Sequence, residues 1–110
     1  MEYYKNLRKL RESLVLIPGL KSYKDFDISI EIGHYEHLGT PVTLKQLLSF
    51  NIASEATVRR HLSQLIKTGM VKKEINPADH RSIVFTLTDK SHQLFQNCMD
   101  ELTSSLKDLL

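Results

Sequence analysis

The sequence predicts a mainly α-helical domain that carries one small β-hairpin, an α+β fold. Two observations lead to this prediction. Over most of the chain, apolar residues recur at intervals of three and four, which is the spacing of one face of a helix. Between residues 70 and 87, two runs rich in β-forming residues instead flank a short polar segment, which is typical of a hairpin.

Length and composition narrow the class of protein. The 110 residues fit one domain, 1–110, because a second domain would bury too little surface. With 41% hydrophobic and 25% charged residues, the composition is that of a soluble globular protein. The longest apolar run, Leu14–Ile17, is too short to cross a membrane, and the N-terminus lacks a signal-peptide pattern. The single cysteine, Cys98, suits a reducing compartment, so we expect a cytoplasmic protein.

The net charge of +2 hides an alternation of basic and acidic blocks. Residues 1–24 and residues 57–81 each hold six basic and two acidic side chains, a net charge of +4 for each block. Residues 25–56 carry a net charge of −4, and residues 82–110 a net charge of −2. Any contact with a polyanion is therefore expected to be local.

A first helix is predicted over residues 2–17. Its apolar residues form one narrow seam, which is typical of a helix that packs along another helix. Pro18 and Gly19 end this helix, because proline cannot continue the hydrogen-bond ladder. The seam consists of Tyr3, Leu7, Leu10, Leu14 and Ile17.

The segment 25–38 fits two structures. Phe26, Ile28, Ile30 and Ile32 alternate with polar residues, as in a half-buried strand, whereas Ile28, Ile32 and Tyr35 have helical spacing. In the helical interpretation Asp25 or Asp27 caps the start and Gly39 closes the end. Periodicity alone does not decide between strand and helix here.

Two helices joined by a tight turn are predicted in the middle of the chain. Thr43 and Gln46 have the spacing of a capping box at the start of a short helix over 43–50. Ser54 is a good N-cap for a second helix, which runs to Thr68. The second helix has an apolar stripe and is polar and basic elsewhere, the pattern of a helix-turn-helix.

A β-hairpin and a last helix complete the chain. Strands are predicted over 70–75 and 82–87, and the polar segment 76–81 between them is too long for a two-residue turn, so we expect a projecting tip. Thr88 or Asp89 then caps a helix that reaches the C-terminus. Its apolar stripe consists of Leu94, Phe95, Cys98, Met99, Leu102, Leu106, Leu109 and Leu110.

A helix-turn-helix followed directly by a hairpin is the winged-helix arrangement. Four segments also occur in the order and at the spacings found in the multiple-antibiotic-resistance regulator (MarR) family: Ala56–Leu65, Lys67–Lys73, Asp79–Arg81 and Leu87–Lys90. Over residues 43–95 the chain therefore resembles this family.

The resemblance implies a winged helix-turn-helix core over 25–88, with dimerisation helices over 1–19 and 89–110. It also favours a helix for residues 27–38, because the family has a helix just before the helix-turn-helix. Ser91 departs from the family, which usually has glycine there. The apolar stripes of the first and last helices exceed what one such domain can cover, so we expect a homodimer on a palindromic site.

The expected DNA contacts are a recognition helix, 54–68, in the major groove and a wing, 76–82, at the minor groove. Arg60 can donate two hydrogen bonds to guanine, Thr57 can bond a base or a phosphate, and the Ala56 methyl group can touch thymine. The lysines would hold phosphates without reading sequence, and the wing would reach a narrow minor groove. The candidate residues are Ser54, Ala56, Thr57, Arg59, Arg60, Ser63, Gln64, Lys67, Lys72, Lys73, His80 and Arg81.

These features predict a sequence-specific transcriptional regulator that binds double-stranded DNA at the nucleoid. A winged helix used for protein–protein contact and a DNA-processing accessory factor of low specificity are the alternatives. No enzyme, cofactor or metal motif is present; His34, His37 and Glu31 share a helical face but lack further ligands. A small-molecule effector is compatible with the resemblance, but no residue supports one. His61 and Cys98 are interpreted as packing residues.

Overall fold

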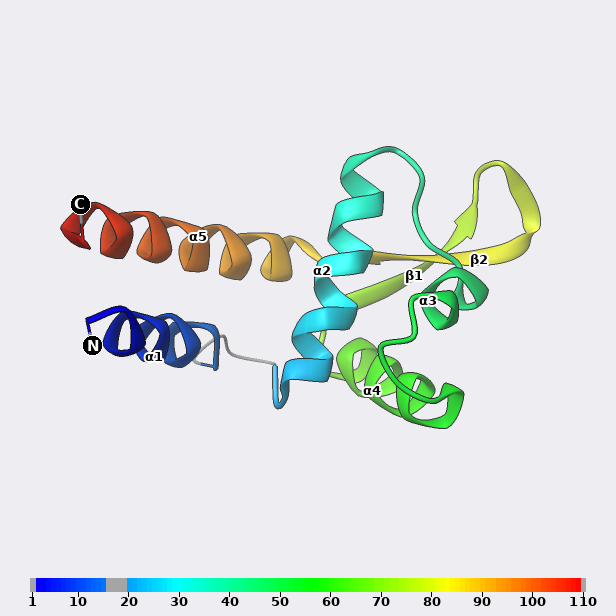
Figure 1. Cartoon of the computed structure of the whole chain (residues 1–110). Coiled ribbons are helices and arrows are strands. Elements are labelled where there is room, and N and C mark those ends of the chain that lie inside the picture. Colours follow the sequence, from blue (N-terminus) through cyan, green and yellow to red (C-terminus); the bar gives the residue numbers. More distant parts are fainter. Residues whose placement is uncertain (1, 16–19, 110) are drawn as a thin grey trace.

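The computed structural model describes residues 2–15 and 20–109. Within them the helices are α1 (Glu2–Val15), α2 (Tyr23–His37), α3 (Leu44–Ser49), α4 (Glu55–Lys67) and α5 (Asp89–Leu109), and the strands are β1 (Val71–Asn76) and β2 (Asp79–Leu87) (Figure 1). This mainly helical chain with one antiparallel hairpin confirms the predicted fold class. In the described part of the chain, no helix is both long enough and apolar enough to cross a membrane.

The helices fall into two groups (Figure 1). α1 and α5 run side by side and contact each other, while α3, α4 and the hairpin form a compact unit beside them. α2 stands between the two groups and contacts both α4 and β2. The molecule is therefore elongated, with principal extents of 52 × 26 × 23 Å.

The ambiguous segment is helical, as the resemblance implied. Ile28 and Ile32, one turn apart, are fully buried in the core, whereas Ile30 is 42% exposed. A half-buried strand would have placed all three on one face, because strand side chains alternate with a period of two. The helix instead buries only the residues that recur every four positions.

The N-terminus of α2 differs from the prediction. Ser22, not Asp25 or Asp27, is the N-cap: its backbone is extended and its hydroxyl accepts the Asp25 backbone N–H at 3.3 Å. Asp25 lies three residues later, where its carboxylate accepts the backbone N–H of Lys21 at 2.8 Å. At the other end Gly39, with φ +82°, terminates the helix as predicted.

The core lies where α2, α3, α4 and the hairpin meet. Val42, just before α3, joins the hairpin because its carbonyl accepts the Phe85 N–H at 2.9 Å. Gly33 allows α2 to approach β2, since a Cβ atom there would lie 2.8 Å from Leu87 Cδ1. The buried cluster consists of Ile28, Ile32, Val42, Leu47, Val58, Leu62, Leu65, Met70, Val71, Phe85 and Leu87.

The hairpin has a shorter turn than predicted. β2 begins at Asp79 rather than at Ser82, and Asp79 pairs with Asn76, so the connection is a two-residue turn followed by a register shift. Asn76 stabilises this end of the hairpin: Oδ1 accepts the N–H of Ala78 at 3.0 Å, and Nδ2 donates to Ser82 Oγ at 3.0 Å. The predicted open loop over 76–81 is therefore wrong, because local side-chain hydrogen bonds fold it into the hairpin.

Hydrogen bonds connect the N-terminus of α5 to the two residues that precede β1. Thr88 is the N-cap, because its hydroxyl oxygen accepts the Ser91 N–H at 3.2 Å, and the same hydroxyl donates to the Gly69 carbonyl. Ser91 is fully buried, and its hydroxyl donates to the Met70 carbonyl. The residue that departs from the family pattern thus adds a buried hydrogen bond between α5 and the residue before β1.

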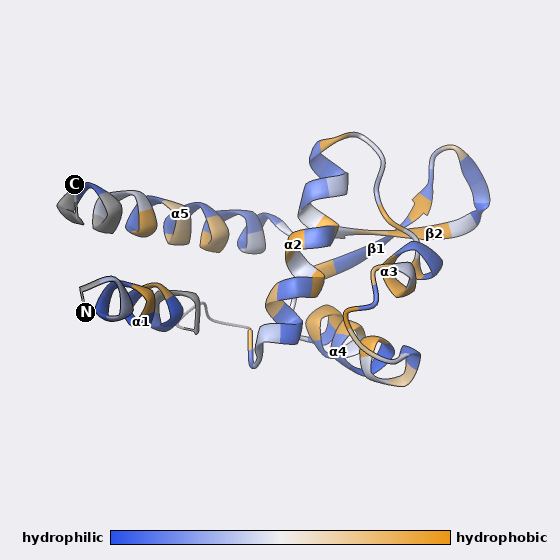
Figure 2. Cartoon of the chain, in the orientation of Figure 1, coloured by the Kyte–Doolittle hydropathy of each residue, from blue (hydrophilic) through white to orange (hydrophobic). Residues whose placement is uncertain are grey.

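Part of the apolar surface of α1 and α5 is exposed in a single chain. Figure 2 shows apolar residues among polar ones along both helices. Tyr3 and Leu7 are each 54% exposed and Met99 is 58% exposed, whereas Leu94 and Phe95 pack against the core. Leu10 is 38% exposed and Leu102 is half-buried. The structure does not describe the side chains of five further stripe positions: Leu14, Ile17, Leu106, Leu109 and Leu110.

Cys98 is buried, as predicted, with 8% of its surface exposed. Burial raises the pKa of its thiol, and the negative charge of Glu101 raises it further. Because the thiolate is the reactive form, iodoacetamide at mildly alkaline pH should alkylate the folded chain much more slowly than the urea-unfolded chain. A mass-spectrometric time course measures both rates, and equal rates would contradict the burial of this thiol.

Candidate nucleic-acid interface

The helix-turn-helix is built from two capped helices. At the start of α3, the Thr43 hydroxyl accepts the Gln46 N–H at 3.2 Å, and the Gln46 side-chain oxygen accepts the Thr43 N–H at 2.9 Å. The predicted capping box is thus confirmed. The turn passes through Asn51, whose φ of 57° is in the left-handed region that asparagine tolerates. Ser54 then caps α4, as predicted.

α4 turns one face to the core and the opposite face to solvent. Val58, Leu62 and Leu65 are buried. Because each residue turns a helix by about 100°, the residues near Arg60 lie on the far side. Among the described residues, Arg60 has no acidic partner within ion-pair distance. The far side carries the exposed residues Ala56, Arg60, Ser63 and Lys67, with the half-buried Gln64 beside them.

The N-terminus of α4 uses its two hydroxyl groups internally. Ser54 Oγ accepts the Thr57 backbone N–H at 3.3 Å and donates to Thr57 Oγ1 at 2.9 Å. The Thr57 hydroxyl still has a hydrogen to donate, whereas Ser54 Oγ has none left. Thr57 is therefore available as a donor, and Ser54 serves mainly to cap the helix.

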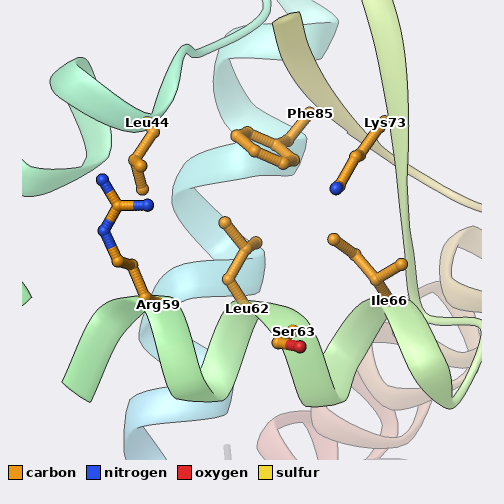
Figure 3. A pocket seen from close by; sticks show the side chains of 7 residues that line it. All are labelled: Leu44, Arg59, Leu62, Ser63, Ile66, Lys73 and Phe85. Atoms are coloured by element: carbon orange, nitrogen blue, oxygen red, sulfur yellow. The ribbon is translucent and has the colours of Figure 1, made fainter. Parts of the chain in front are cut away.

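Arg59 lines a hollow between α4 and the hairpin (Figure 3), and its guanidinium also lies 3.5 Å from Glu55 Oε1 one turn back on α4. The hollow has a volume of about 210 Å³. Its apolar wall comes from α3, α4 and β2, and two cationic side chains, Arg59 and Lys73, enter it from opposite sides. Its lining residues are Leu44, Arg59, Leu62, Ser63, Ile66, Lys73 and Phe85.

Two lysines with the same predicted role, Lys72 and Lys73, lie on different faces of the hairpin. Lys73 pairs across the hairpin with Phe85 and lies on the face that turns to α4. Lys72 lies on the other face, because strand side chains alternate, and its ammonium group is 3.3 Å from Glu74 Oε1. Only Lys73 therefore shares a surface with α4.

The wing ends in an arginine held by an aspartate. Arg81 Nε lies 3.5 Å from Asp79 Oδ1, and the same oxygen accepts the Arg81 backbone N–H at 3.1 Å. The Arg81 side chain is 94% exposed, and its neighbour His80 is exposed too. The contact fixes the backbone around Arg81 and leaves most of the guanidinium free.

Solved structures of known proteins share this architecture. MarR from E. coli, crystallised as a mutant with operator DNA, is 21% identical, covers 98% of this chain and 76% of its own, and superposes with a TM-score of 0.64. A mutant of S. aureus MepR bound to an oligodeoxyribonucleotide gives 18% identity, coverage of 100% and 79%, and a TM-score of 0.73. RV1404 from Mycobacterium tuberculosis gives 11% identity, coverage of 98% and 71%, and a TM-score of 0.78.

The chain has a MarR-like winged-helix fold. The resemblance found in the sequence is thereby confirmed at the level of the fold. No protein-family model and no curated protein matches the chain. The predicted contact residues lie on α4, at its N-cap or on the hairpin, and Lys72 lies on the hairpin face turned away from α4.

The sequence did not predict one polar contact between α2 and α4. His61 was interpreted as a packing residue, but its Nδ1 lies 2.7 Å from Oδ1 of Asp25 on α2. The Asp25 side chain is 3% exposed and that of His61 19% exposed. The serine and aspartate spaced by three, Ser22 and Asp25, are a helix-start signal that could have marked this carboxylate. Its partner on α4 is 36 residues away, beyond the reach of local patterns.

No group of three or more histidine, cysteine or acidic side chains in the described part of the chain is arranged to hold a metal ion. His34 instead packs its ring edge-on against Tyr35, with ring centroids 5.1 Å apart. His92, a further histidine, lies 2.8 Å from Glu36 Oε2.

Proposed function

We propose that this chain is a sequence-specific transcriptional regulator that binds double-stranded DNA in the cytoplasm, at the nucleoid. The observation that carries the proposal is the outer face of α4, which is polar and basic and begins at a capped helix N-terminus. An α-helix fits the major groove with such a face toward the base edges. The structures of MarR with operator DNA and of MepR with an oligodeoxyribonucleotide support this reading of the fold.

The contacts divide by chemistry. Arg60 is the candidate for a bidentate contact to guanine, with Ala56 and Thr57 beside it on the same helix. Arg59 and Lys73, which meet at the hollow, are candidates for one stretch of phosphate backbone. Arg81 is the candidate for the minor groove, where a narrow groove concentrates negative potential. Ser54, Ser63, Gln64, Lys67, Lys72 and His80 complete the proposed set.

A homodimer is part of the proposal. Tyr3, Tyr4 and Leu7 of α1 are each more than half exposed, and Met99 of α5 is 58% exposed. A second copy related by a two-fold axis would cover these side chains on both chains at once. Such a dimer would present two α4 helices to the two halves of a palindromic site.

The alternatives make different predictions for the same surface. A protein-binding winged helix would present apolar residues on the outer face of α4, and this face is polar and basic instead. An accessory factor of low specificity would bind random duplex as tightly as any selected site. The ratio of the two affinities distinguishes that factor from a regulator.

The proposal predicts steep salt dependence of DNA binding. Each neutralised phosphate releases a counterion, so a dimer with roughly six to ten phosphate contacts should lose about 10³–10⁵ in affinity between about 50 and 200 mM salt. Fluorescence anisotropy with a duplex selected from a random library measures this slope. A salt-independent affinity, or no binding to any duplex at low ionic strength, would refute the proposed function.

A further inference from the structure

Two of the carboxylates on α2 each lie within hydrogen-bond distance of a histidine from a different element. Near its N-terminus, Asp25 Oδ1 lies 2.7 Å from His61 Nδ1 on α4. Near its C-terminus, Glu36 Oε2 lies 2.8 Å from His92 Nε2 on α5, and Glu36 Oε1 accepts the Leu87 N–H at 2.7 Å. α2, which stands between the two groups of elements in Figure 1, is thus linked to both of them by these hydrogen bonds. Only the Asp25 link reaches α4.

The Asp25 carboxylate has both oxygens engaged. Oδ2 accepts the backbone N–H of Lys21, in the segment that enters α2, and Oδ1 faces His61. Its side chain is only 3% exposed, so water is a poor substitute for either partner. Because the carboxylate cannot turn without losing one contact, it gives His61 a fixed point of attachment.

His61 lies where it can set the rotation of α4. It follows Val58 by three residues and precedes Leu65 by four, so it borders the buried stripe on one flank. Apolar packing tolerates small rotations of a helix about its axis, whereas a short hydrogen bond from one flank does not. Arg60 directly precedes His61 in the chain, so it moves with any such rotation of α4. A contact with base edges requires side chains to be held within about 0.5 Å.

We propose that Asp25 is a positioning residue for DNA reading: through His61 it fixes the rotation of α4, and through Lys21 it ties that rotation to the segment that enters α2. This inference rests on the proposed function. Loss of the carboxylate should therefore weaken binding to the selected duplex more than binding to random duplex. A purely structural role would weaken both together.

The tautomer of His61 gives a readout that needs no DNA. A carboxylate can only accept, so His61 must carry its hydrogen on Nδ1 in the wild-type chain. In Asp25→Asn the amide oxygen can accept the Lys21 N–H while the amide nitrogen donates to Nδ1, which moves the ring hydrogen to Nε2. The substitution therefore keeps a bond to His61 but reverses its direction.

The experiment compares Asp25→Ala, Asp25→Asn and Glu36→Gln by anisotropy on selected and random duplexes and by nitrogen-15 NMR of the histidine rings. Asp25→Ala should lower the ratio of selected to random affinity about tenfold. Asp25→Asn should retain most of that ratio and shift the His61 tautomer. Glu36→Gln alters the other histidine pair and should change neither. If Asp25→Ala does not fold, His61→Phe, which keeps a ring but cannot hydrogen-bond, takes its place.

Two results would overturn the inference: an unchanged ratio in Asp25→Ala, or a wild-type His61 with its hydrogen on Nε2. A wild-type chain that binds no duplex would refute the proposed function instead. The ring signals, and faster amide exchange of α4 in Asp25→Ala, would then still test whether Asp25 holds that helix.

Discussion

Leu7→Glu should convert the proposed homodimer to a folded monomer. Leu7 is 54% exposed in a single chain, so its replacement leaves the core intact. In a two-fold dimer the same leucine is buried on both chains, and each side chain contributes about 1.5–3 kcal/mol to the free energy of association. A glutamate buried there without a partner opposes association further. Sedimentation velocity measures the mass, and circular dichroism shows whether the fold is retained. Affinity for a palindromic duplex should fall by about 10²–10⁴, because the two half-sites no longer bind as one unit.

Lys5→Glu is the matched control for the dimer experiment. Lys5 is exposed on the opposite side of α1 from Leu7, so the same acidic side chain is introduced outside the apolar seam. This variant should remain a dimer. A wild-type chain that stays monomeric at high micromolar concentration would exclude the dimer and, with it, the palindromic site.

Arg60→Ala should lose about 1–3 kcal/mol of binding free energy on the preferred site and reduce the preference at one base pair. The physical reason is that a bidentate guanidinium contact discriminates guanine from the other bases. Arg60 is on the outer face of α4 and takes no part in the core, so the free energy of unfolding should change little. Binding to a library of single-base site variants, measured by anisotropy, gives the preference at each position.

Lys72→Ala serves as the comparison for Arg60→Ala. The Lys72 ammonium group faces Glu74 on the hairpin surface turned away from α4. Loss of the lysine should therefore weaken binding only slightly, and equally for all duplexes, because a phosphate contact does not read sequence. An equal, sequence-independent loss in both variants would show that Arg60 contacts phosphate and not a base.

Local signals in the sequence determined the helices around the turn. Ser54 and the Thr43–Gln46 capping box mark helix starts because their side chains bond backbone groups three residues away. The apolar spacing of α4 predicts its buried face for the same reason, since both depend on neighbours within one or two turns. Together with the resemblance to the MarR family, these signals predicted the order of the elements and most of the candidate contact residues.

The tertiary structure decided what depends on distant partners. Residues 25–33 fit a strand or a helix equally well by spacing, and burial of Ile28 and Ile32 against α4 and the hairpin selects the helix. Lys72 and Lys73 lie on opposite faces because strand side chains alternate, and the packing of the hairpin on α4 decides that Lys73, paired with Phe85, is the one that faces α4. The connection after β1 is shorter than predicted, because Asn76 bonds within the turn. The link from Asp25 to His61 spans 36 residues. No local pattern encodes such a pair, because only packing of α2 on α4 makes one side chain the partner of the other.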